Sequence, residues 1–190
     1  MIACYAQNSR PKEAIELFNE MRKRNVSVQP DEMTLVSIIS ACSQLGDLRF
    51  GVWIESFMRQ VGIDMDDYLA TALIDLYAKC GCIDKANELF HGLKNKDVLA
   101  YSAMILGFGI NGKPLDSIRS FEEMEDAKIS PNLVTFTAIL TAYNHAGLVK
   151  EGYRCFTSIS SEHKLVPSSD HYGIMVDLLG CAGRLCEHMS

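Results

Sequence analysis

A short segment recurs five times along this 190-residue chain, and this repeat limits the possible folds more than any other feature. Each copy begins on a small residue, and successive starts are 37, 35, 31 and 35 residues apart. A period near 34 residues is typical of stacked helix pairs, because each pair buries its apolar face against its neighbours. The copies AIELFNEM, GVWIESFM, ANELFHGL, SIRSFEEM and GYRCFTSI start at Ala14, Gly51, Ala86, Ser117 and Gly152.

Glycines form a second register that supports helix pairs. A glycine lies five residues before each of the last four segments, at Gly46, Gly81, Gly112 and Gly147. It recurs as Gly183, and Ser9 holds the matching place in the first repeat. A glycine after an apolar stretch suits the end of a helix, where the chain turns through the left-handed region. Each repeat is therefore predicted to be a helix, a tight turn and a second helix.

The second helix of each repeat is predicted to pack through its small residue. The absence of bulk lets this helix approach its partner closely, and an aromatic residue follows four positions later on the same face. These aromatic residues are Phe18, Phe90, Phe121 and Phe156, with Trp53 and Phe57 in the divergent second repeat. Adding bulk at Ala86 is expected to disturb this contact.

The two registers divide the chain into six segments. Four complete repeats are expected at residues 32–66, 67–97, 98–132 and 133–168. Residues 1–31 form a partial repeat without the start of its first helix, and residues 169–190 form a partial repeat with a first helix only. We expect one solenoid, cut at both ends, without a separate globular domain. Residues 185–190 should be poorly packed, because no second helix follows them.

Composition and motifs exclude several functions. The longest nearly apolar stretch, residues 98–110, is too short to span a bilayer, and no targeting segment opens the chain. The seven cysteines are scattered through helical segments and are expected to be small buried residues of a reducing compartment. Cys80 and Cys82 lack the spacing of a zinc knuckle. A zinc-dependent cytidine deaminase needs His-x-Glu and Cys-x-x-Cys, and neither motif occurs. We expect no metal, no cofactor and no catalysis.

Four runs of the sequence resemble the pentatricopeptide repeat family, and the resemblance covers nearly the whole chain. They are TALIDLYAKCGCIDKANELF, LVSIISACSQLGDLRFG, VTFTAILTAYNHAGLVKEG and HYGIMVDLLGCAGRL. The order of repeat lengths is similar to that of the plant organellar subclass with mixed long and short repeats (PLS type). The resemblance implies an all-α solenoid, a right-handed superhelix of helix-turn-helix repeats. It also implies a place in the mitochondrion or chloroplast, with the transit peptide and the C-terminal RNA-editing domains outside this chain.

The resemblance further implies that the chain binds single-stranded RNA, one base per repeat. In the family, the second residue of a repeat stacks on the base, and the fifth and last residues read its edge. Thr71 with Asp97 would favour guanine, and Ser102 with Asn132 would favour adenine. In the other repeats Val36 is paired with Asp66 and Thr137 with Ser168, which are unusual combinations. The stacking residues would be Tyr68, Leu99 and Val134, and Lys79 would contact phosphate.

Two other interpretations remain open. An early Thr or Ser in a helix often bonds its own backbone, and an Asp or Asn before a helix often caps it. The chain could also be a protein- or peptide-binding scaffold of the tetratricopeptide kind, which a net charge of −6 and few inner-face cations favour. RNA remains the expected partner, with editing or processing proteins beside it, and no membrane or small-molecule substrate is expected.

Overall fold

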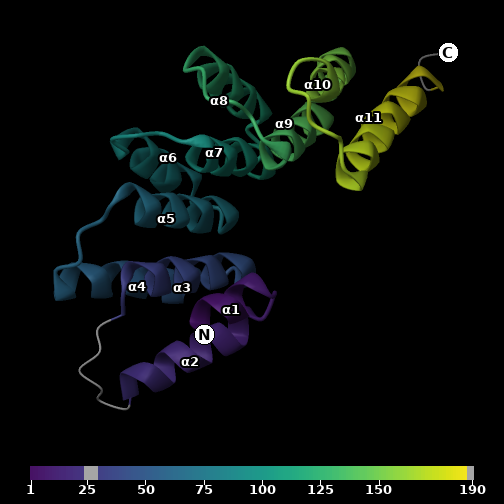
Figure 1. The fold of residues 1–190 in the computed structure, drawn as a ribbon. Coiled ribbons are helices and arrows are strands. Elements are labelled where there is room, and N and C mark those ends of the chain that lie inside the picture. The colour runs from purple at the N-terminus through teal and green to yellow at the C-terminus, as the bar shows by residue number, and fades with distance from the viewer. Residues whose placement is uncertain (24–29, 188–190) are drawn as a thin grey trace. The chain divides into compact units, whose positions relative to one another are not determined.

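The chain folds into paired helices in the computed structural model, which describes residues 1–23 and 30–187 and the side chains up to residue 180 (Figure 1). Within these ranges there are eleven helices and no strand, which confirms the all-α prediction. No helix among the described residues is long and apolar enough to cross a membrane.

The helices fall into two compact parts. The first, Met1–Asn95, contains α1 (Ile2–Gln7), α2 (Pro11–Lys23), α3 (Glu32–Leu45), α4 (Leu48–Val61), α5 (Asp67–Lys79) and α6 (Ile83–Gly92). The second, Lys96–Ser190, contains α7 (Val98–Ile110), α8 (Pro114–Asp126), α9 (Leu133–Ala146), α10 (Val149–Ser161) and α11 (Ser169–Glu187).

Side-chain caps determine where four of the first helices begin. The carboxylates of Asp31, Asp66 and Asp97 accept backbone N–H groups at the starts of α3, α5 and α7. The amide oxygen of Asn132 does the same for α9. A capping side chain satisfies a donor that the first turn of a helix leaves unpaired. The helices therefore begin directly after these four residues.

The turns between paired helices use left-handed backbone, as the glycine register predicts. Gly46, Gly81, Gly112 and Gly147 have φ between 66° and 83°, and Ser9 has φ 56°. The prediction for Gly183 is wrong, because α11 continues through it to Glu187. A glycine inside a helix costs only about 1 kcal/mol, so its presence alone does not end the helix.

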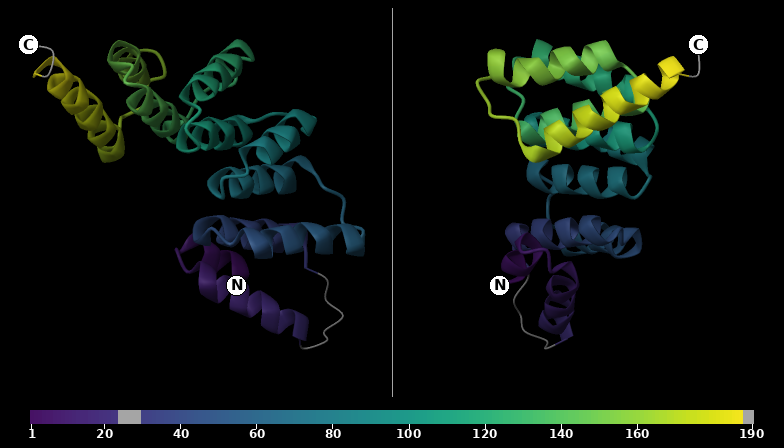
Figure 2. Two further views of the ribbon diagram at one scale, coloured as in Figure 1. Left: turned by 180° about the vertical axis from the view of Figure 1, so that it is seen from behind. Right: turned by 90° about the vertical axis from the view of Figure 1, so that its right-hand side faces the viewer.

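In each part, one first helix lies at the centre of the packing. In the first part α3 contacts α1, α2, α4 and α5, and in the second part α9 contacts α7, α8, α10 and α11 (Figures 1 and 2). Within each part the core is shared between neighbouring repeats, as in a solenoid, because α3 packs on the first helices α1 and α5, and α9 packs on α7 and α11.

Two of the small residues of the second helices, Gly51 and Gly152, face the following repeat. A Cβ added at Gly51 of α4 would lie 2.1 Å from Leu76 Cδ2 of α5, and one added at Gly152 of α10 would lie 2.5 Å from Leu178 Cδ2 of α11. Ala86 is fully buried. The lack of a side chain at Gly51 and Gly152 therefore lets the second helix of one repeat approach the first helix of the next repeat. The prediction named only the partner helix of each second helix.

The aromatic and cysteine predictions hold in part. Phe18, Phe90 and Phe121 are buried, and Phe156 is half-buried. Burial raises the pKa of the thiols of Cys42 and Cys155 to about 12, so both behave as apolar groups. Contrary to the prediction, Cys4 is exposed, because α1 buries its Ile2 and Ala6 face instead. Cys80 and Cys82 are only half-buried, because they flank the turn between α5 and α6. The side chains of Cys181 and Cys186, and the packing predicted for residues 185–190, lie outside the described side chains.

Candidate nucleic-acid interface

The residues predicted to stack on bases are exposed at the starts of the first helices. Tyr68 on α5, Leu99 on α7 and Val134 on α9 are 67%, 54% and 62% exposed. Each is an apolar side chain in the first helical turn, next to a capping residue. Met33 on α3 holds the equivalent place and is 64% exposed. Sequence reasoning missed Met33, although its position as the second residue of its repeat was the available signal.

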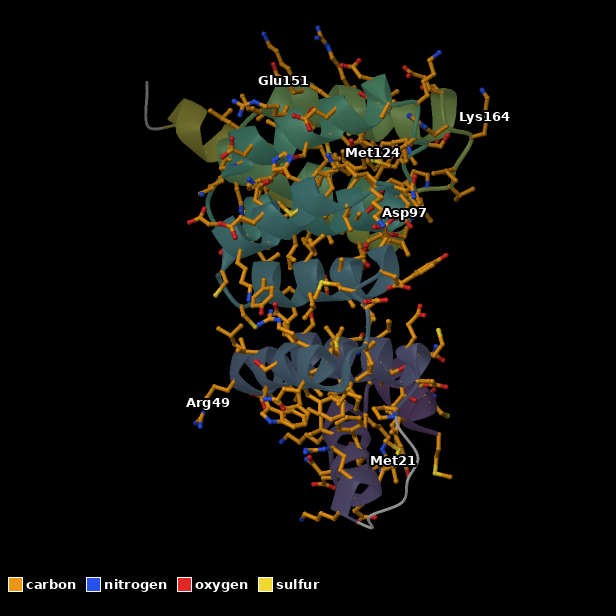
Figure 3. The ribbon with its side chains drawn as sticks, turned by 90° about the vertical axis from the view of Figure 1, so that its left-hand side faces the viewer. Met21, Arg49, Asp97, Met124, Glu151 and Lys164 are labelled. Atoms are coloured by element: carbon orange, nitrogen blue, oxygen red, sulfur yellow. The ribbon has the colours of Figure 1, made fainter. Side chains whose placement is uncertain are left out.

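Three of the four residues predicted to read the base edge from the end of a repeat, Asp66, Asp97 and Asn132, are helix caps. Asp66 Oδ1 accepts from Leu69 N at 2.9 Å, and Asp97 Oδ1 accepts from Leu99 N at 3.0 Å and from Ala100 N at 2.9 Å. Figure 3 labels Asp97 at the start of α7. These bonds use only Oδ1 of each carboxylate. The capping role is therefore present, and it leaves a second carboxylate oxygen of each residue out of the cap.

The hydroxyls predicted to read the base edge as fifth residues bond to backbone. Thr71 donates to Asp67 O at 2.7 Å, Ser102 to Val98 O at 2.6 Å and Thr137 to Leu133 O at 3.0 Å. Ser102 is only 4% exposed. A hydroxyl has one proton but two lone pairs, so Thr71 and Thr137, both half-buried, keep an acceptor for another partner.

One predicted pair is joined by a third residue. Ser102 Oγ lies 2.6 Å from Thr135 Oγ1, and Asn132 N donates to Thr135 Oγ1 at 3.2 Å. Asn132 Oδ1 accepts in turn from Thr135 N at 3.0 Å, which completes a capping box. Thr71 lies in the first compact part and Asp97 in the second, so their action as a pair stays a prediction.

The next repeat has the same arrangement with histidine in place of threonine. Thr137 Oγ1 lies 3.3 Å from His171 Nε2, and Ser168 N donates to His171 Nδ1 at 3.0 Å. His171 Nε2 also lies 3.0 Å from Leu133 O. Since Ser168 N can only donate and Leu133 O can only accept, the ring is neutral with its proton on Nε2. His171 is 1% exposed, and sequence reasoning did not single it out.

The one predicted phosphate contact is already ion-paired. Lys79 Nζ lies 2.9 Å from Asp75 Oδ2, and the same oxygen accepts from Ser43 Oγ at 2.6 Å. The Lys79 side chain is 37% exposed, so it reaches solvent. Because Asp75 offsets its charge, Lys79 attracts phosphate less than an unpaired lysine on the same helix would.

Acidic groups gather at the helix starts of the first part. The carboxylate of Asp66, by hydrogen bonding and by its charge, raises the pKa of Glu32. Asp67 holds the loop that closes the 31-residue repeat, accepting from Lys94 N at 3.2 Å and from Asn95 N at 3.1 Å. This loop leads directly to the cap of α7. Carboxylates of Glu32, Asp66 and Asp67 therefore lie at the starts of α3 and α5.

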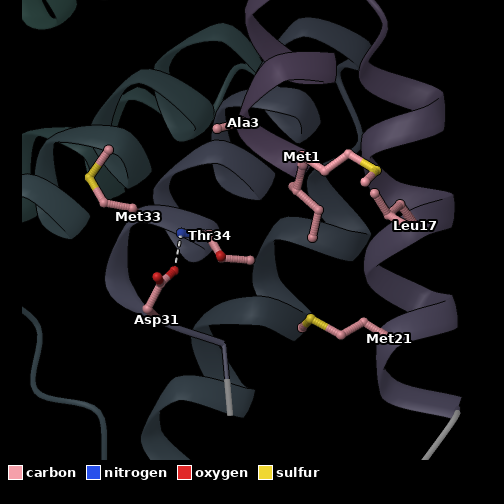
Figure 4. Close-up of a pocket in the computed structure, with 8 residues that line it drawn as sticks. Met1, Ala3, Leu17, Met21, Asp31, Met33 and Thr34 are labelled. Atoms are coloured by element: carbon pink, nitrogen blue, oxygen red, sulfur yellow. Dashed lines mark hydrogen bonds between the residues drawn. The ribbon is translucent and has the colours of Figure 1, made fainter. Parts of the chain in front are cut away.

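A cavity of about 460 Å³ lies among α1, α2 and α3 (Figure 4). Apolar side chains line it, including Met1, Leu17 and Met21, and Asp31 and Thr34 lie at its edge. None of the residues predicted to read or stack on a base lines it, although Met33 does. No group of three or more His, Cys, Asp or Glu suited to a metal occurs among the described residues. This cavity is therefore separate from the predicted reading and stacking residues, which lie at the helix starts.

Comparison with protein families identifies the repeats. The family model described as the PPR repeat family matches residues 1–44 and 96–145, and the model described as PPR repeat matches residues 69–98 and 134–162. Together they cover well over half of the chain. The chain belongs to the pentatricopeptide repeat family. The matches extend through both compact parts, so this pentatricopeptide repeat chain carries the family's motif along most of its length.

Relatives of this pentatricopeptide repeat chain occur in Arabidopsis thaliana. One pentatricopeptide repeat-containing protein is 44% identical over 188 residues, which is 98% of this chain and 34% of that protein. A relative labelled chloroplastic is 41% identical over 98% of this chain and 23% of its own length. A relative labelled mitochondrial is 40% identical over 100% of this chain and 34% of its own length. The chain thus spans about a quarter to a third of the length of these relatives.

Solved structures show the same fold. The pentatricopeptide repeat protein PPR10 from maize matches with a TM-score of 0.62 and 20% identity over 96% of this chain and 31% of PPR10. PPR10 in complex with an 18-nt psaJ RNA element matches with a TM-score of 0.59 and 23% identity, over 94% of this chain and 30% of PPR10. The pentatricopeptide repeat domain of Arabidopsis thaliana protein-only RNase P 1, in complex with tRNA, matches with a TM-score of 0.65 and 14% identity. This match covers 94% of this chain and 95% of that domain.

Proposed function

We propose that this chain is a sequence-selective array for single-stranded RNA, within a longer organellar factor for RNA processing or cytidine-to-uridine editing. The proposal rests on one recurring arrangement. At the starts of α5, α7 and α9, an exposed apolar residue lies beside a polar cap that keeps one polar atom out of the helix. Unpaired bases offer a flat face for the apolar residue and a hydrogen-bonding edge for the cap.

The caps give each repeat its base preference. The ionised carboxylate of Asp97 can only accept hydrogen bonds, so it suits guanine, whose N1 donates. The amide of Asn132 can also donate, so it suits adenine, whose N1 accepts. Thr71 and Ser102 are assigned to the same two bases, and Asp66 and Thr137 belong to repeats with less selective pairs. Tyr68, Leu99 and Val134 stack on the bases, and Lys79 contributes one phosphate contact.

Organellar relatives and RNA-bound neighbours support this proposal. Relatives labelled chloroplastic and mitochondrial match nearly the whole chain, and two neighbours with the same fold were solved with RNA. The family matches assign repeats to this chain. An editing or processing reaction would therefore come from another domain of the protein or from a protein partner.

The test compares two short unstructured RNAs, one with 5′-GA-3′ at its centre and one with 5′-CC-3′. The wild-type chain should bind the first more tightly. Asn132→Asp should move the second preference from adenine toward guanine, because the carboxylate loses the donor of the amide. Asp31, Asp66 and Asp97 already cap equivalent helices, so the substituted α9 should keep its cap.

Equal binding of both RNAs, or no binding by the folded protein, would contradict the proposal. Either result would favour the second candidate, a peptide-binding scaffold. Two observations favour the peptide-binding scaffold: the net charge of −6 and the ion pair between Lys79 and Asp75. A pulldown with peptides of basic composition would then be the direct measurement of that activity.

A further inference from the structure

Thr135 connects the two residues assigned to read one base. Ser102 comes from α7, Asn132 precedes α9, and Thr135 is the third residue of α9. Thr135 is fully buried and lies within hydrogen-bonding distance of both, at 2.6 Å from Ser102 Oγ and 3.2 Å from Asn132 N. A buried hydroxyl between two polar groups keeps all three in one arrangement.

The bonds to Thr135 fix which atom of the Asn132 amide points outward. Asn132 Oδ1 faces Thr135 N at 3.0 Å and Thr135 Oγ1 at 3.2 Å. A backbone N–H can only donate, so the oxygen of the amide must take this inner place. The Nδ2 group is the remaining atom and serves as a donor. Its natural partner is a base whose Watson–Crick edge presents a ring-nitrogen acceptor, as adenine N1 and cytosine N3 do.

Ser102 has little access to a base. It is 4% exposed, and Val98 O and Thr135 Oγ1 both lie within 2.6 Å of its oxygen. The single proton of the Ser102 hydroxyl is therefore donated to Val98 O, and its oxygen faces Thr135 Oγ1 inside the protein. We infer that Thr135 is a positioning residue for base recognition, and that Ser102 acts on the base through Thr135 and Asn132 instead of touching it. This inference rests on the proposed RNA-binding function.

The next repeat supports the inference independently. There the third residue of α11, His171, lies 3.3 Å from Thr137 Oγ1 and accepts from Ser168 N. A polar third residue thus joins the fifth and last residues of the preceding repeat a second time. At the equivalent places of α5 and α7 the chain has Leu69 and Ala100, which have no polar side-chain atom. The connection is therefore a property of the last two repeats described.

The test is a double-mutant cycle on base discrimination. The probes are 5′-UUUGAUUU-3′ and 5′-UUUGGUUU-3′, and the measured quantity is the ratio of their affinities. Ser102→Ala and Thr135→Val should each lower the adenine preference by about three- to tenfold, the value of one hydrogen bond. The double variant should be no worse than either single variant, since both changes break one connection. Thr135→Ser, which keeps the hydroxyl, should restore the preference.

The control is Thr157→Val on α10, which removes an exposed hydroxyl that donates to the backbone oxygen of Tyr153 at 2.9 Å. It should leave the ratio unchanged. If Thr135→Val does not fold, a second cycle combines Ser102→Ala with Asn132→Ala. In that cycle the double variant should lose no more of the adenine preference than Asn132→Ala alone. Additive losses in either cycle would mean that Ser102 touches the base, and would overturn the inference alone. A wild-type chain that binds both probes equally would overturn the inference together with the proposed function.

Discussion

In the proposed function, single residues at the candidate interface carry two roles at once. Asp97 and Asn132 cap helices, and the same side chains keep one polar atom outside the cap. A cap contributes about 1 kcal/mol to stability, so selection for folding alone would preserve these residue types. The choice between Asp and Asn has little effect on the cap, because both accept from the backbone through oxygen. In the proposed function, the choice between Asp and Asn is therefore free to encode the base.

At Lys79, removing the paired charge should strengthen RNA binding. Asp75→Asn keeps a side-chain oxygen for Ser43 and leaves the lysine unneutralised. We expect the affinity for a single-stranded RNA to rise about two- to fivefold, the size of an exposed ion pair. Asp116→Asn, which breaks the pair with Arg119 on α8, is the matched control and should change affinity less. Unchanged binding by Asp75→Asn would remove Lys79 from the interface, and fluorescence anisotropy would measure both variants.

Among the elements, α4, α5 and α6 are linked by a buried carboxylate. Glu55 accepts from Tyr77 Oη and from Lys85 Nζ, the latter at 2.8 Å, and it is 7% exposed. Burial opposes its ionisation, but the bonds from Lys85 and Tyr77 outweigh burial and lower the pKa of Glu55 below its ordinary 4.5. A carboxyl group whose pKa is lower in the folded state stabilises that state at pH values above its ordinary pKa. This stabilisation is lost as the pH falls through the pKa of the folded state.

Glu55→Gln should therefore lower stability at neutral pH by about 1 to 3 kcal/mol, the cost of losing hydrogen bonds to charged groups. The difference between the variant and the wild type should shrink as the pH falls below 4.5. Urea unfolding at pH 7 and at pH 3.5 would measure it, with Glu88→Gln on the exposed side of α6 as control. A difference that stayed constant between the two pH values would show that the charge of Glu55 does not link these helices.

The packing between helices should be sensitive to added side-chain volume at a buried small residue. Ala86 on α6 is fully buried, and overpacking such a site costs about 1 to 3 kcal/mol. Ala86→Leu should lower the melting temperature, whereas Glu88→Leu on the same helix should change it little because Glu88 is exposed. Equal melting temperatures for the wild type and Ala86→Leu would show that the small-residue register is misplaced.

On the scale of the whole molecule, charge should make RNA binding depend little on salt. The chain has 24 acidic and 18 basic residues, and its one predicted inner-face lysine is ion-paired. Each phosphate contact to a single strand adds about −0.7 to the slope of log affinity against log salt. We expect a slope of about −0.7 to −1.4 between roughly 50 and 200 mM salt. A slope steeper than about −3 would reveal a basic surface that the described residues do not show.

Local patterns made much of the fold predictable. The helix starts follow from Asp31, Asp66, Asp97 and Asn132, since a cap and its helix lie within a few residues of each other. The exposed second residues follow from the same register. The roles of Thr135 and His171 did not follow, because their partners Ser102 and Thr137 lie 33 and 34 residues away. The signal in the sequence was a polar third residue of the helix, at a place where Leu69 and Ala100 are apolar and Thr34 is polar.

The capping box of α9 also affects how such arrays can be rearranged. Asn132 ends one repeat, but its hydrogen-bond partner Thr135 belongs to the next. A graft joined between residues 132 and 133 would move the asparagine and leave the threonine behind, replacing it with whatever third residue the acceptor array supplies. A junction placed after Thr135 would transfer both together. The smallest piece that can be exchanged without loss of geometry is therefore offset by three residues from the sequence repeat.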